Sequence, residues 1–454
     1  MAGPGIVWLT RDWVDHVARQ SPARLAVGVF AGVIAVFTAL RSIPAATSAG
    51  TRPSFADALF TATSAVSVTG LTTVNTGDYW SPLGHVIILA AIKVGGLGVM
   101  TLASLLGFAV SRHLGLTQKL LTASETKASR FGEVGSLIRT VIITSTVIEL
   151  AVFALLIPRF IKIGETVGEA TWHAMFYAIS AFNNAGFSPT TAGLAPHTSD
   201  WLILLPIMVG VFIGSLGFPV ILNLARTWRA PRRWRLHTKL TLLTSAVLLV
   251  LGAVVIAVLE WRRGLEDLNW SDTILNSLFY SVMTRSGGFG TVPVSELEES
   301  THVVFDALMF VGGGSASTAG GIKVTTLAVM FIALVAEARG DFDMNSFRRR
   351  IPRHILKVGV SVTMVAATTV LVGTVALMEV TGAQLGPALF EVISAFGTCG
   401  LSLGLTENLP DSGKYILTIM MFIGRTGTMT LAAALALRSR RRVIRFPEER
   451  LNIG

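Results

Sequence analysis

The sequence predicts an all-α polytopic membrane protein in which four pseudo-repeated units surround a central pore. Three observations predict this fold: an apolar composition, an alternation of charge along the chain, and a local pattern that occurs four times. Of the 454 residues, 52% are hydrophobic and 14% are charged, whereas soluble domains have roughly 25% charged residues. Apolar stretches of about 20 residues, enough to cross ~30 Å of hydrocarbon, occur repeatedly. This composition argues against a cytosolic enzyme.

Lys and Arg residues gather in every second connection between the apolar stretches. The segments 1–24, 112–139, 226–239, 337–357 and 438–454 hold 26 of the 37 Lys and Arg residues but 9 of the 27 Asp and Glu residues. Because basic residues near short loops stay in the cytoplasm during insertion, these blocks predict that both termini are cytoplasmic. The arginines are expected to contact anionic membrane lipids, and docking of a cytosolic protein is the alternative. Nucleic acid is not an expected partner.

One pattern, an apolar stretch with aromatic residues that leads to Gly and then Leu or Phe, occurs four times. The four segments are DALFTATSAVSVTGLTT from Asp57, AMFYAISAFNNAGFSPT from Ala174, SLFYSVMTRSGGFGTV from Ser277 and ALFEVISAFGTCGLSLG from Ala388. A second glycine landmark follows the aligned glycines after 25, 28, 24 and 24 residues. The landmarks are VGGLG from Val94, IGSLG from Ile213, VGGGS from Val311 and IGRTG from Ile423.

The apolar stretches before the aligned glycines are too short to cross the membrane and too apolar for plain loops, so we expect four re-entrant half-helices. Each repeat then contains a span, a half-helix, an extended strand and a second span. The expected repeats are 1–112, 113–226, 227–340 and 341–454. The eight expected full spans are 25–40, 83–111, 137–158, 201–225, 239–260, 303–336, 355–379 and 414–437.

The function is expected to lie in the backbone that follows the half-helices. Non-helical backbone is tolerated at membrane depth only where it is buried in protein or lines water. Four such strands around one axis can form a ring of carbonyl oxygens that replaces the hydration shell of a cation. Helix packing or a helix C-cap is the alternative for any single glycine. The predicted filter strands are Val68-Thr69-Gly70, Asn184-Ala185-Gly186, Ser286-Gly287-Gly288 and Thr398-Cys399-Gly400.

With these strands, the glycine landmarks and the ending FPEERLNIG at 446–454, the chain resembles the Trk/Ktr/HKT superfamily of potassium transporters, in particular the Ktr-type B membrane subunit. The resemblance implies potassium uptake across the bacterial plasma membrane and a homodimer with one pore per protomer. It also implies a cytosolic RCK-type ring, similar to KtrA or TrkA, that binds a regulatory nucleotide (ATP/ADP or NAD). No cofactor is expected in this chain, and K⁺ at the filter is the only metal expected.

The filter strands differ from those of potassium channels. The TVGYG motif is absent and each strand has one filter-like glycine where that motif has two, which predicts a shorter and less stringent filter. In plant relatives of the family, a serine at the first filter glycine accompanies sodium transport. Gly70 stands at this position, so K⁺ is the expected cargo, and Na⁺ dependence is left open.

The second span of repeat three contains the glycine-rich segment 311–323, VGGGSASTAGGIK. Each glycine costs roughly 1 kcal/mol relative to Ala inside a helix, so a loop within the membrane is expected here. The resemblance implies that this loop is a gate; glycine-mediated helix packing is the alternative, and the spacing does not fit a phosphate-binding GxxxxGK[ST] loop. The predicted gate consists of Gly312, Gly313, Gly314, Ser315, Ala316, Ser317, Thr318, Ala319, Gly320, Gly321, Lys323 and Arg425.

Three further charged positions lie within apolar segments. Arg425 stands where the other repeats have a small residue, and charge inside a membrane is expensive and usually functional. We expect Arg425 to form an electrostatic barrier under the filter and to pair with the gate; a salt bridge to a neighbouring carboxylate such as Glu391 is the alternative. For Lys93 and Lys323, the alternative role is that of an anchor whose side chain extends to the membrane surface.

Two other classes of function remain as rivals. A secondary transporter would have discontinuous helices around a midplane solute or Na⁺ site, and inverted repeats would distinguish it. A membrane-embedded enzyme would need a convergent catalytic cluster, and the sequence contains none, so no enzymatic activity is expected.

Overall fold

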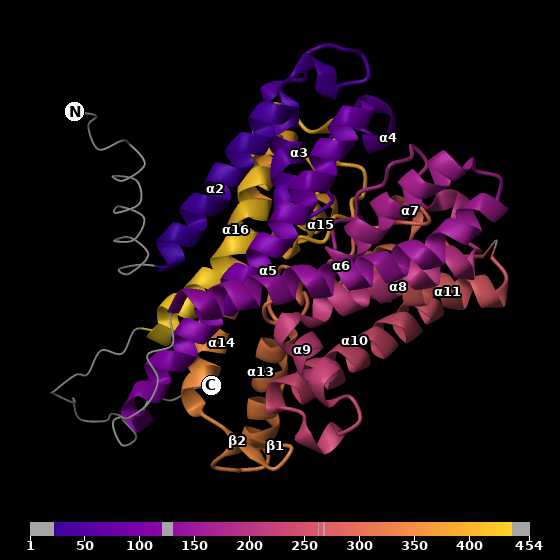
Figure 1. Cartoon of the computed structure of the whole chain (residues 1–454). Coiled ribbons are helices and arrows are strands. Elements are labelled where there is room, and N and C mark those ends of the chain that lie inside the picture. The colour runs from indigo at the N-terminus through magenta and orange to yellow at the C-terminus, as the bar shows by residue number, and fades with distance from the viewer. Residues whose placement is uncertain (1–21, 120–129, 262, 267, 438–454) are drawn as a thin grey trace, which may run out of the picture.

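The computed structural model describes residues 22–119, 130–261, 263–266 and 268–437. This part of the chain is mostly helical (Figure 1). The predicted basic blocks 1–24 and 112–139 lie partly outside the described residues, and the block 438–454, with the ending 446–454, lies wholly outside them.

The helices fall into three sets according to their place relative to the filter strands. Four long helices come first in each predicted repeat: α2 (Pro22–Arg41), α6 (Arg130–Lys162), α10 (Leu236–Glu260) and α14 (Arg353–Thr381). Four short helices lead directly into the filter strands: α3 (Phe55–Ser67), α7 (Val167–Phe182), α11 (Trp270–Met283) and α15 (Leu385–Gly397). The helices after the strands are α5 (Pro82–Lys119), α8 (Trp201–Leu216), α9 (Phe218–Thr227), α12 (Glu299–Phe310), α13 (Val324–Ala338) and α16 (Asp411–Leu437).

Shorter elements occupy the connections. On the side of the filter strands lie α4 (Thr76–Tyr79), η1 (Pro44–Ala46), η2 (Ala195–His197), η4 (Val294–Glu296) and η5 (Thr406–Asn408). At the basic end lie η3 (Pro231–Arg233) and an antiparallel hairpin of β1 (Met344–Ser346) and β2 (Arg349–Ile351).

Local sequence explains where the short helices begin and end. The Ser54 hydroxyl accepts a hydrogen bond from the Asp57 amide (3.0 Å) and caps α3. Thr166 and Glu169 form a reciprocal capping box at the start of α7, which satisfies two backbone donors that a helix leaves unpaired. At the other end, α3 and α15 stop at residues in the left-handed conformation, Val68 and Thr398. These helices therefore end where the filter strands begin.

Four described helical segments are long and apolar enough to cross a membrane, and the bent pair α8–α9 makes a fifth if it is counted as one span. The four segments are Pro82–Thr101, Ile138–Lys162, Leu236–Glu260 and Arg353–Thr381. Other expected spans are shorter or interrupted: Val27–Arg41 and Val324–Ala338 are apolar but short. The expected number of eight spans therefore stays a prediction.

The expected continuous span 201–225 is wrong, because the chain bends by 102° between α8 and α9. Gly217 adopts φ +91° at the bend, and a Cβ atom there would strike the Ser315 carbonyl oxygen. The amide of Phe218 donates to the Ala316 carbonyl (3.0 Å). The glycine-rich segment thus occupies the space that a straight helix would fill.

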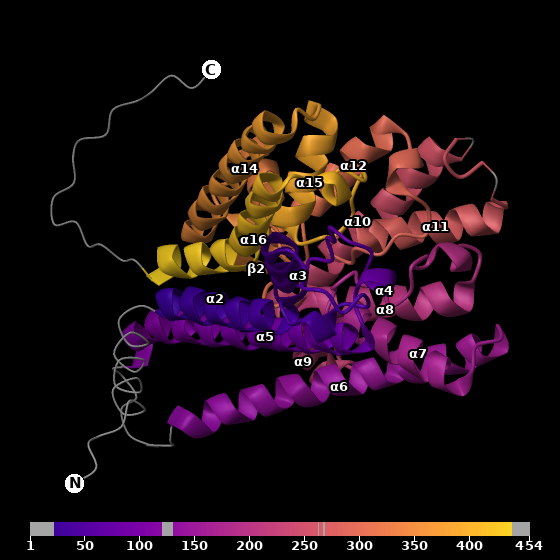
Figure 2. The ribbon, with the colours of Figure 1, turned by 90° about the horizontal axis from the view of Figure 1, so that it is seen from above.

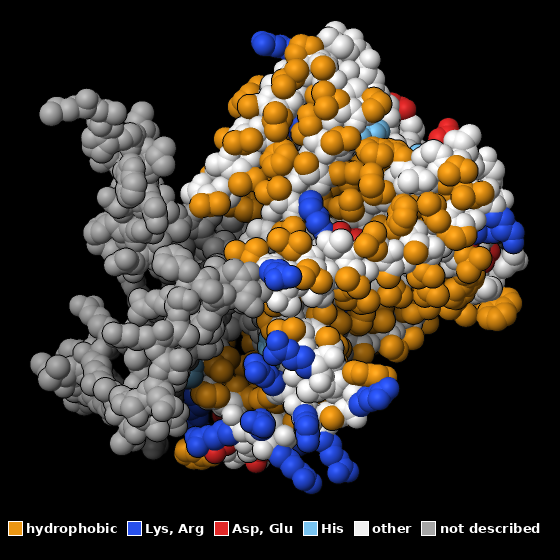
Figure 3. Space-filling view, in the orientation of Figure 1, with side chains coloured by type: hydrophobic (Ala, Val, Ile, Leu, Met, Phe, Trp, Pro, Cys, Tyr) orange, Lys and Arg blue, Asp and Glu red, His pale blue; other side chains and the backbone are white. Residues whose placement is uncertain are grey.

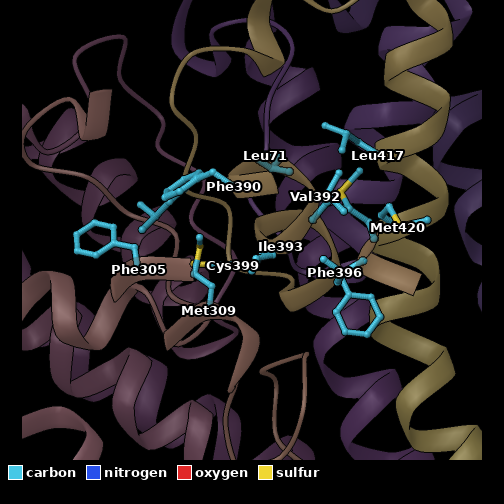
Figure 4. Packing of buried hydrophobic residues seen from close by; sticks show 14 of the residues in the cluster. Leu71, Phe305, Met309, Phe390, Val392, Ile393, Phe396, Cys399, Leu417 and Met420 are labelled. Carbon is cyan, nitrogen blue, oxygen red and sulfur yellow. The ribbon is translucent and has the colours of Figure 1, made fainter. Parts of the chain in front are cut away.

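The first and last predicted repeats pack against each other. Helix α16 contacts α2, α3 and α5 as well as its own neighbours α14 and α15, and α2, α5 and α16 lie side by side in both ribbon views (Figures 1 and 2). Buried apolar residues join the short helix α15 to α12 and α16; Figure 4 shows Cys399 among Phe305, Met309 and Ile393. The surface of the long helices is largely hydrophobic, and Lys and Arg gather at the end of the molecule near β1 and β2 (Figure 3).

Candidate functional site

The four predicted filter strands have the same unusual backbone conformation. The first residue of each has a positive φ: Val68 +56°, Asn184 +59°, Ser286 +88° and Thr398 +47°. The third residue of each also has a positive φ: Gly70 +95°, Gly186 +68°, Gly288 +73° and Gly400 +101°. Positive φ is uncommon outside glycine and is an outlier for a β-branched residue such as valine or threonine. Strained backbone of this kind persists where the surrounding structure enforces it, which is typical of functional sites.

The four strands contact one another in a closed ring. A Cβ atom on Gly70 would lie 2.5 Å from the Ala185 carbonyl oxygen, and one on Gly186 would lie 3.0 Å from the Cα of Gly288. A Cβ atom on Gly288 would strike the Cys399 carbonyl oxygen, and one on Gly400 would strike the Thr69 carbonyl oxygen. The order is therefore strand one, two, three, four and back to one. A side chain at Gly70, Gly288 or Gly400 would collide with the next strand, and one at Gly186 would make a tight contact with it.

Each strand is also held from behind by its own short helix. The amides of Thr69, Ala185 and Cys399 donate to carbonyls five residues earlier, each at 2.8 Å. Side-chain hydroxyls add to this: Ser64 and Ser394 accept from the amides of Gly70 and Gly400, both at 3.1 Å. These hydrogen bonds occupy backbone amide groups of the filter strands. Because helix carbonyl ends carry partial negative charge, four short helices that end at one ring favour a cation there.

One of the predicted filter carbonyls has a partner within the protein. The Ser286 hydroxyl donates to the Thr398 carbonyl oxygen at 2.7 Å and thereby joins strands three and four. The Cys399 thiol donates to the Met283 carbonyl oxygen at 3.2 Å.

The second glycine landmark explains how the following helices approach the ring. A Cβ atom at Gly95, Gly214 or Gly424 would strike a carbonyl oxygen near the end of a short helix, at Val66, Phe182 or Phe396 respectively. Glycine at these positions lets α5, α8 and α16 pack directly on the ends of α3, α7 and α15. In repeat three, Gly312 instead faces the Gly320 carbonyl oxygen, so the glycine-rich segment folds onto itself.

Buried polar side chains hold the backbone after the filter strands, and the sequence analysis missed two of them. Tyr280 accepts from the Val292 amide (2.8 Å) and donates to the Val292 carbonyl (2.5 Å). Tyr177 lies 2.7 Å from the Ser188 hydroxyl. Tyrosine inside an otherwise apolar short helix, eight or nine residues before the aligned glycine, was the available signal.

Glu391 has this same role in repeat four. Its carboxylate accepts hydrogen bonds from the hydroxyls of Ser402 and Thr406, both at 2.5 Å, and from the Leu403 amide at 3.0 Å. None of the partners that the structure gives Glu391 is Arg425. The alternative ion pair between these two residues is therefore not present in the structure.

The glycine-rich segment 311–323 is non-helical and contacts the ring from one side. The Thr318 hydroxyl donates to the Asn184 side-chain oxygen at 3.0 Å, and the Gly320 amide lies 3.4 Å from the Ser286 hydroxyl. Arg425, which is buried, donates from Nη1 to the Thr318 carbonyl. The Lys323 ammonium donates to the Ala319 carbonyl at 2.7 Å, so Lys323 folds back onto the segment and does not extend to the membrane surface. Arg425 and Lys323 therefore both bind carbonyls of this segment.

Among the described residues, no group of three or more His, Cys, Asp or Glu side chains could hold a metal ion. The ring is built from backbone, and backbone carbonyl oxygens are ligands that suit a hard monovalent cation that has lost its water.

A helical bundle of apolar segments around a closed ring of backbone strands defines a membrane protein that transports cations. The chain belongs to the TrkH family of cation transport proteins, whose sequence profile matches residues 10–442. The resemblance to the Trk/Ktr superfamily is thereby confirmed, as is the expectation that the chain is not an enzyme.

Relatives match the chain over nearly its whole length. It is 36% identical over 437 residues to the Ktr system potassium uptake protein D of Bacillus subtilis, covering 96% of this chain and 97% of the relative. It is 35% identical over 451 residues to the Ktr system potassium uptake protein B of the same organism, covering 98% and 100%. The crystal structure of the potassium transporter TrkH from Vibrio parahaemolyticus has the same fold, with a TM-score of 0.72, 18% identity and coverage of 90% and 83%.

Proposed function

We propose that this protein takes up potassium across the bacterial plasma membrane through a ring of backbone carbonyls. The observation that carries the proposal is the closed ring of four strands, each with positive φ at its first and third residue. The names of the two Bacillus subtilis relatives, both potassium uptake proteins, support K⁺ as the cargo. The ligands are the carbonyls of residues 68–70, 184–186, 286–288 and 398–400.

In the proposed mechanism, K⁺ loses its hydration water at the ring and binds carbonyl oxygens in place of water. The carbonyl ends of α3, α7, α11 and α15 add partial negative charge beside the ion. The ion then moves down its electrochemical gradient past the glycine-rich segment. A cation is favoured because the carbonyl oxygens of the ring carry partial negative charge. The glycines let neighbouring strands approach closely.

The glycine-rich segment is the proposed gate. Its contacts support this role, because it touches strands two and three through Asn184 and Ser286 and is bound by Arg425. Release of the Arg425 bond to the Thr318 carbonyl would let the segment leave the ion path. Arg425 also places a positive charge below the ring, which opposes the passage of cations while the segment is closed.

We further propose that two copies of the chain form a homodimer and that a cytosolic RCK-type ring with a bound nucleotide controls the gate. The word "system" in the names of both relatives supports a partner subunit. The basic residues near η3, β1 and β2 lie at one end of the molecule (Figure 3), which supports a cytoplasmic position for that end. The basic blocks 1–24 and 438–454 of the sequence support the same position for both termini.

The filter assignment is tested by replacing Gly70 and Gly288 separately with Ser. Each serine side chain would collide with the next strand and widen or distort the ring. In cells that lack other potassium uptake, competition of K⁺ and Na⁺ with Rb⁺ uptake should then show a weaker preference for K⁺. If K⁺ and Na⁺ compete with Rb⁺ in both variants as they do in the wild type, the filter assignment is wrong.

The gate is tested by deleting residues 313–320 while keeping Lys323 and Arg425. The shortened segment cannot reach Asn184 or Ser286, so Rb⁺ uptake should become independent of a co-expressed ring protein and faster than in the wild type. A deletion that is stable in the membrane yet inactive, or still dependent on the ring protein, would contradict the gate.

A further inference from the structure

Lys93 is an exception among the four repeats. It lies two residues before the landmark glycine Gly95, and the other repeats have Phe212, Phe310 and Phe422 at this position. An aromatic residue at this depth fits the hydrocarbon, whereas an ammonium group does not. The single lysine therefore needs a specific explanation.

Lys93 forms an ion pair inside the apolar part of the molecule. Its ammonium lies 2.6 and 2.5 Å from the two carboxylate oxygens of Glu149 and 2.7 Å from the Ser145 hydroxyl. Lys93 belongs to the candidate span Pro82–Thr101 and Glu149 to the candidate span Ile138–Lys162, and each residue is near the middle of its span. The alternative, an anchor whose ammonium group extends to the membrane surface, does not fit this ion pair.

The same carboxylate binds the residue that precedes the second filter strand. The Asn183 amide donates from Nδ2 to a Glu149 oxygen at 3.0 Å and to the Ile179 carbonyl at 2.8 Å. Asn183 is fully buried, ends α7 and is followed directly by Asn184, the strained first residue of the strand. On its other side, a Cβ atom at Gly96 would strike the Asn183 side-chain oxygen. Helices α5 and α6 thus hold Asn183 between them.

The counterparts of Asn183 are held differently. They are Ser67, Arg285 and Gly397. Ser67 donates to the Thr63 carbonyl of its own helix (2.6 Å), and Arg285 donates to the Ser245 carbonyl of α10 (3.2 Å). Within the described residues, the second filter strand differs from the other three because the residue before it is bound to a carboxylate.

We propose that Lys93, Glu149 and Asn183 are positioning residues that fix the second filter strand and thereby set the preference of the ring for K⁺ over Na⁺. Lys93 and Ser145 orient the carboxylate, the carboxylate fixes the Asn183 amide, and the amide fixes the end of α7 and the carbonyls that follow. If this hold is lost, the strand relaxes and the ring adjusts to the smaller Na⁺. This inference rests on the proposed function, because it assigns selectivity to the same ring.

Three variants test the inference. Asn183→Leu keeps the ion pair and removes the hydrogen bonds of the Asn183 amide to Glu149 and to the Ile179 carbonyl. Glu149→Gln keeps the size of the side chain and removes its charge. The double variant Lys93→Phe with Glu149→Leu removes both charges and gives position 93 the residue type of the other repeats. Replacing a buried ion pair with apolar residues of similar size is often neutral for stability, so the double variant should reach the membrane in normal amounts.

A matched ion pair on the same helix provides the control. Arg159 of α6 lies 2.7 Å from Asp200, and its side chain is 27% exposed, compared with 26% for Lys93. The structure records no hydrogen bond or ion pair between Arg159 and the filter strands within the described residues. Arg159→Met therefore removes an equivalent ion pair without touching Asn183.

The readout is Rb⁺ uptake in potassium-uptake-deficient cells, with K⁺ or Na⁺ as competitor and the amount of protein in the membrane measured in parallel. The measured ratio is the Na⁺ concentration divided by the K⁺ concentration that inhibits Rb⁺ uptake equally. In the three test variants this ratio should fall by about tenfold, the factor for one lost hydrogen bond to a charged group. Arg159→Met should leave the ratio unchanged.

The possible outcomes separate the inference from the function on which it rests. A wild-type protein that does not take up Rb⁺ would overturn the proposed function. Normal uptake by the wild type with an unchanged ratio in Asn183→Leu would overturn the inference alone. Equal loss of both ions in every variant, without a change of ratio, would also overturn it, since the network would then only support folding. If the charge variants fail to accumulate, Asn183→Leu still decides, because its ion pair is intact.

Discussion

At the scale of single residues, the filter strands share a backbone conformation and not a side chain. Their first residues are Val68, Asn184, Ser286 and Thr398, and all four adopt positive φ. Each non-glycine residue in such a conformation costs of order 1–3 kcal/mol. The same strain at four positions with unrelated side chains indicates that the direction of the backbone groups is what the fold maintains. The groups that these residues have in common are the backbone N–H and the carbonyl, and of the two the carbonyl oxygen can bind a cation.

Glycine at the third position of a strand permits a positive φ and also leaves room for the neighbouring strand. Two glycines of repeat four separate these roles. Gly400 and Gly404 both have positive φ, +101° and +89°. A Cβ atom at Gly400 would strike the Thr69 carbonyl oxygen, whereas nothing lies within 4 Å of one at Gly404.

We expect Gly404→Ala to lose about 1–2 kcal/mol of stability from backbone strain alone and to keep its ion preference. Gly400→Ala should lose more stability and should also lose preference for K⁺, because the added methyl group displaces the first strand. Thermal unfolding in detergent and Rb⁺ competition measure the two effects. Equal behaviour of the two variants would show that the contact with Thr69 has no functional consequence.

At the scale of elements, the distance of 24 to 28 residues between the two glycine landmarks has a structural cause. It is the length of chain needed to leave a filter strand, cross a connecting loop and return along a helix to the end of the short helix. At that point Gly95, Gly214 and Gly424 face the carbonyls of Val66, Phe182 and Phe396. The landmark therefore marks a close helix contact near the ring.

Helix α5 offers a matched pair of glycines for testing this contact. We expect Gly95→Ala to destabilise the protein by about 1–3 kcal/mol, because a methyl group would overlap the Val66 carbonyl in a closely packed site. Gly98→Ala, with nothing within 4 Å of the added Cβ, should be neutral or slightly stabilising, because alanine is the better helix former. Chemical or thermal unfolding of purified protein would show the difference, and equal stability of both variants would contradict the close contact.

Repeat three departs from the other repeats at this same element. The glycine-rich segment separates α12 from α13, and Gly312 faces Gly320 of the segment and not a short helix. The segment packs against the bend at Gly217, where the Gly314 amide donates to the Ser215 carbonyl at 2.7 Å. One irregular segment therefore accounts for both the interrupted helix of repeat three and the bent helix of repeat two.

At the scale of the whole molecule, an ion pair joins the first and the fourth repeat. Lys414, in the first turn of α16, lies 2.8 Å from Asp57 at the start of α3. Asp57 also accepts from the hydroxyls of Ser54 and Thr73, both at 2.7 Å. Because these residues are 357 positions apart in the chain, the pair connects repeat four to repeat one.

This connection predicts a pH dependence of stability. Burial raises the pKa of the Asp57 carboxyl, but the hydrogen bonds from Lys414, Ser54 and Thr73 outweigh it, so the pKa lies below its ordinary value of 3.8. A carboxyl group with a lower pKa in the folded state stabilises the fold above its unfolded pKa, and this stabilisation disappears as the pH falls through the folded pKa.

Between about pH 6 and pH 3, the melting temperature of the wild type should therefore fall more than that of Asp57→Asn, which has already lost the ion pair. Asp343→Asn serves as the control, since Asp343 forms an ion pair with Arg350 that is 68% exposed and exposed pairs contribute little. If Asp57→Asn and the wild type lose the same number of degrees, the ion pair does not stabilise ring closure.

The sequence predicted those features that depend on neighbouring residues. The short helices, their ends at the filter strands and the interruption at 311–323 follow from apolar periodicity, caps and glycines within about 15 residues of one another. The bend at Gly217 was missed because its cause, Ser315, lies in another repeat. The partner of Lys93 was missed for the same reason: Glu149 is 56 residues away in the chain, and no local pattern connects them.

The sequence by itself determined that the chain is an apolar helical protein with four equivalent glycine strands and that it belongs to a family of cation transporters. The helical character and the four strands follow from composition and from short patterns, which depend on local physical chemistry. The family follows from the resemblance of those patterns to known relatives. The tertiary structure alone decided that the strands close in the order one to four, that Arg425 and Lys323 bind carbonyls of the glycine-rich segment, and that Glu149 connects Lys93 to the second strand. Such contacts depend on how distant helices pack, and packing is a property of the whole fold.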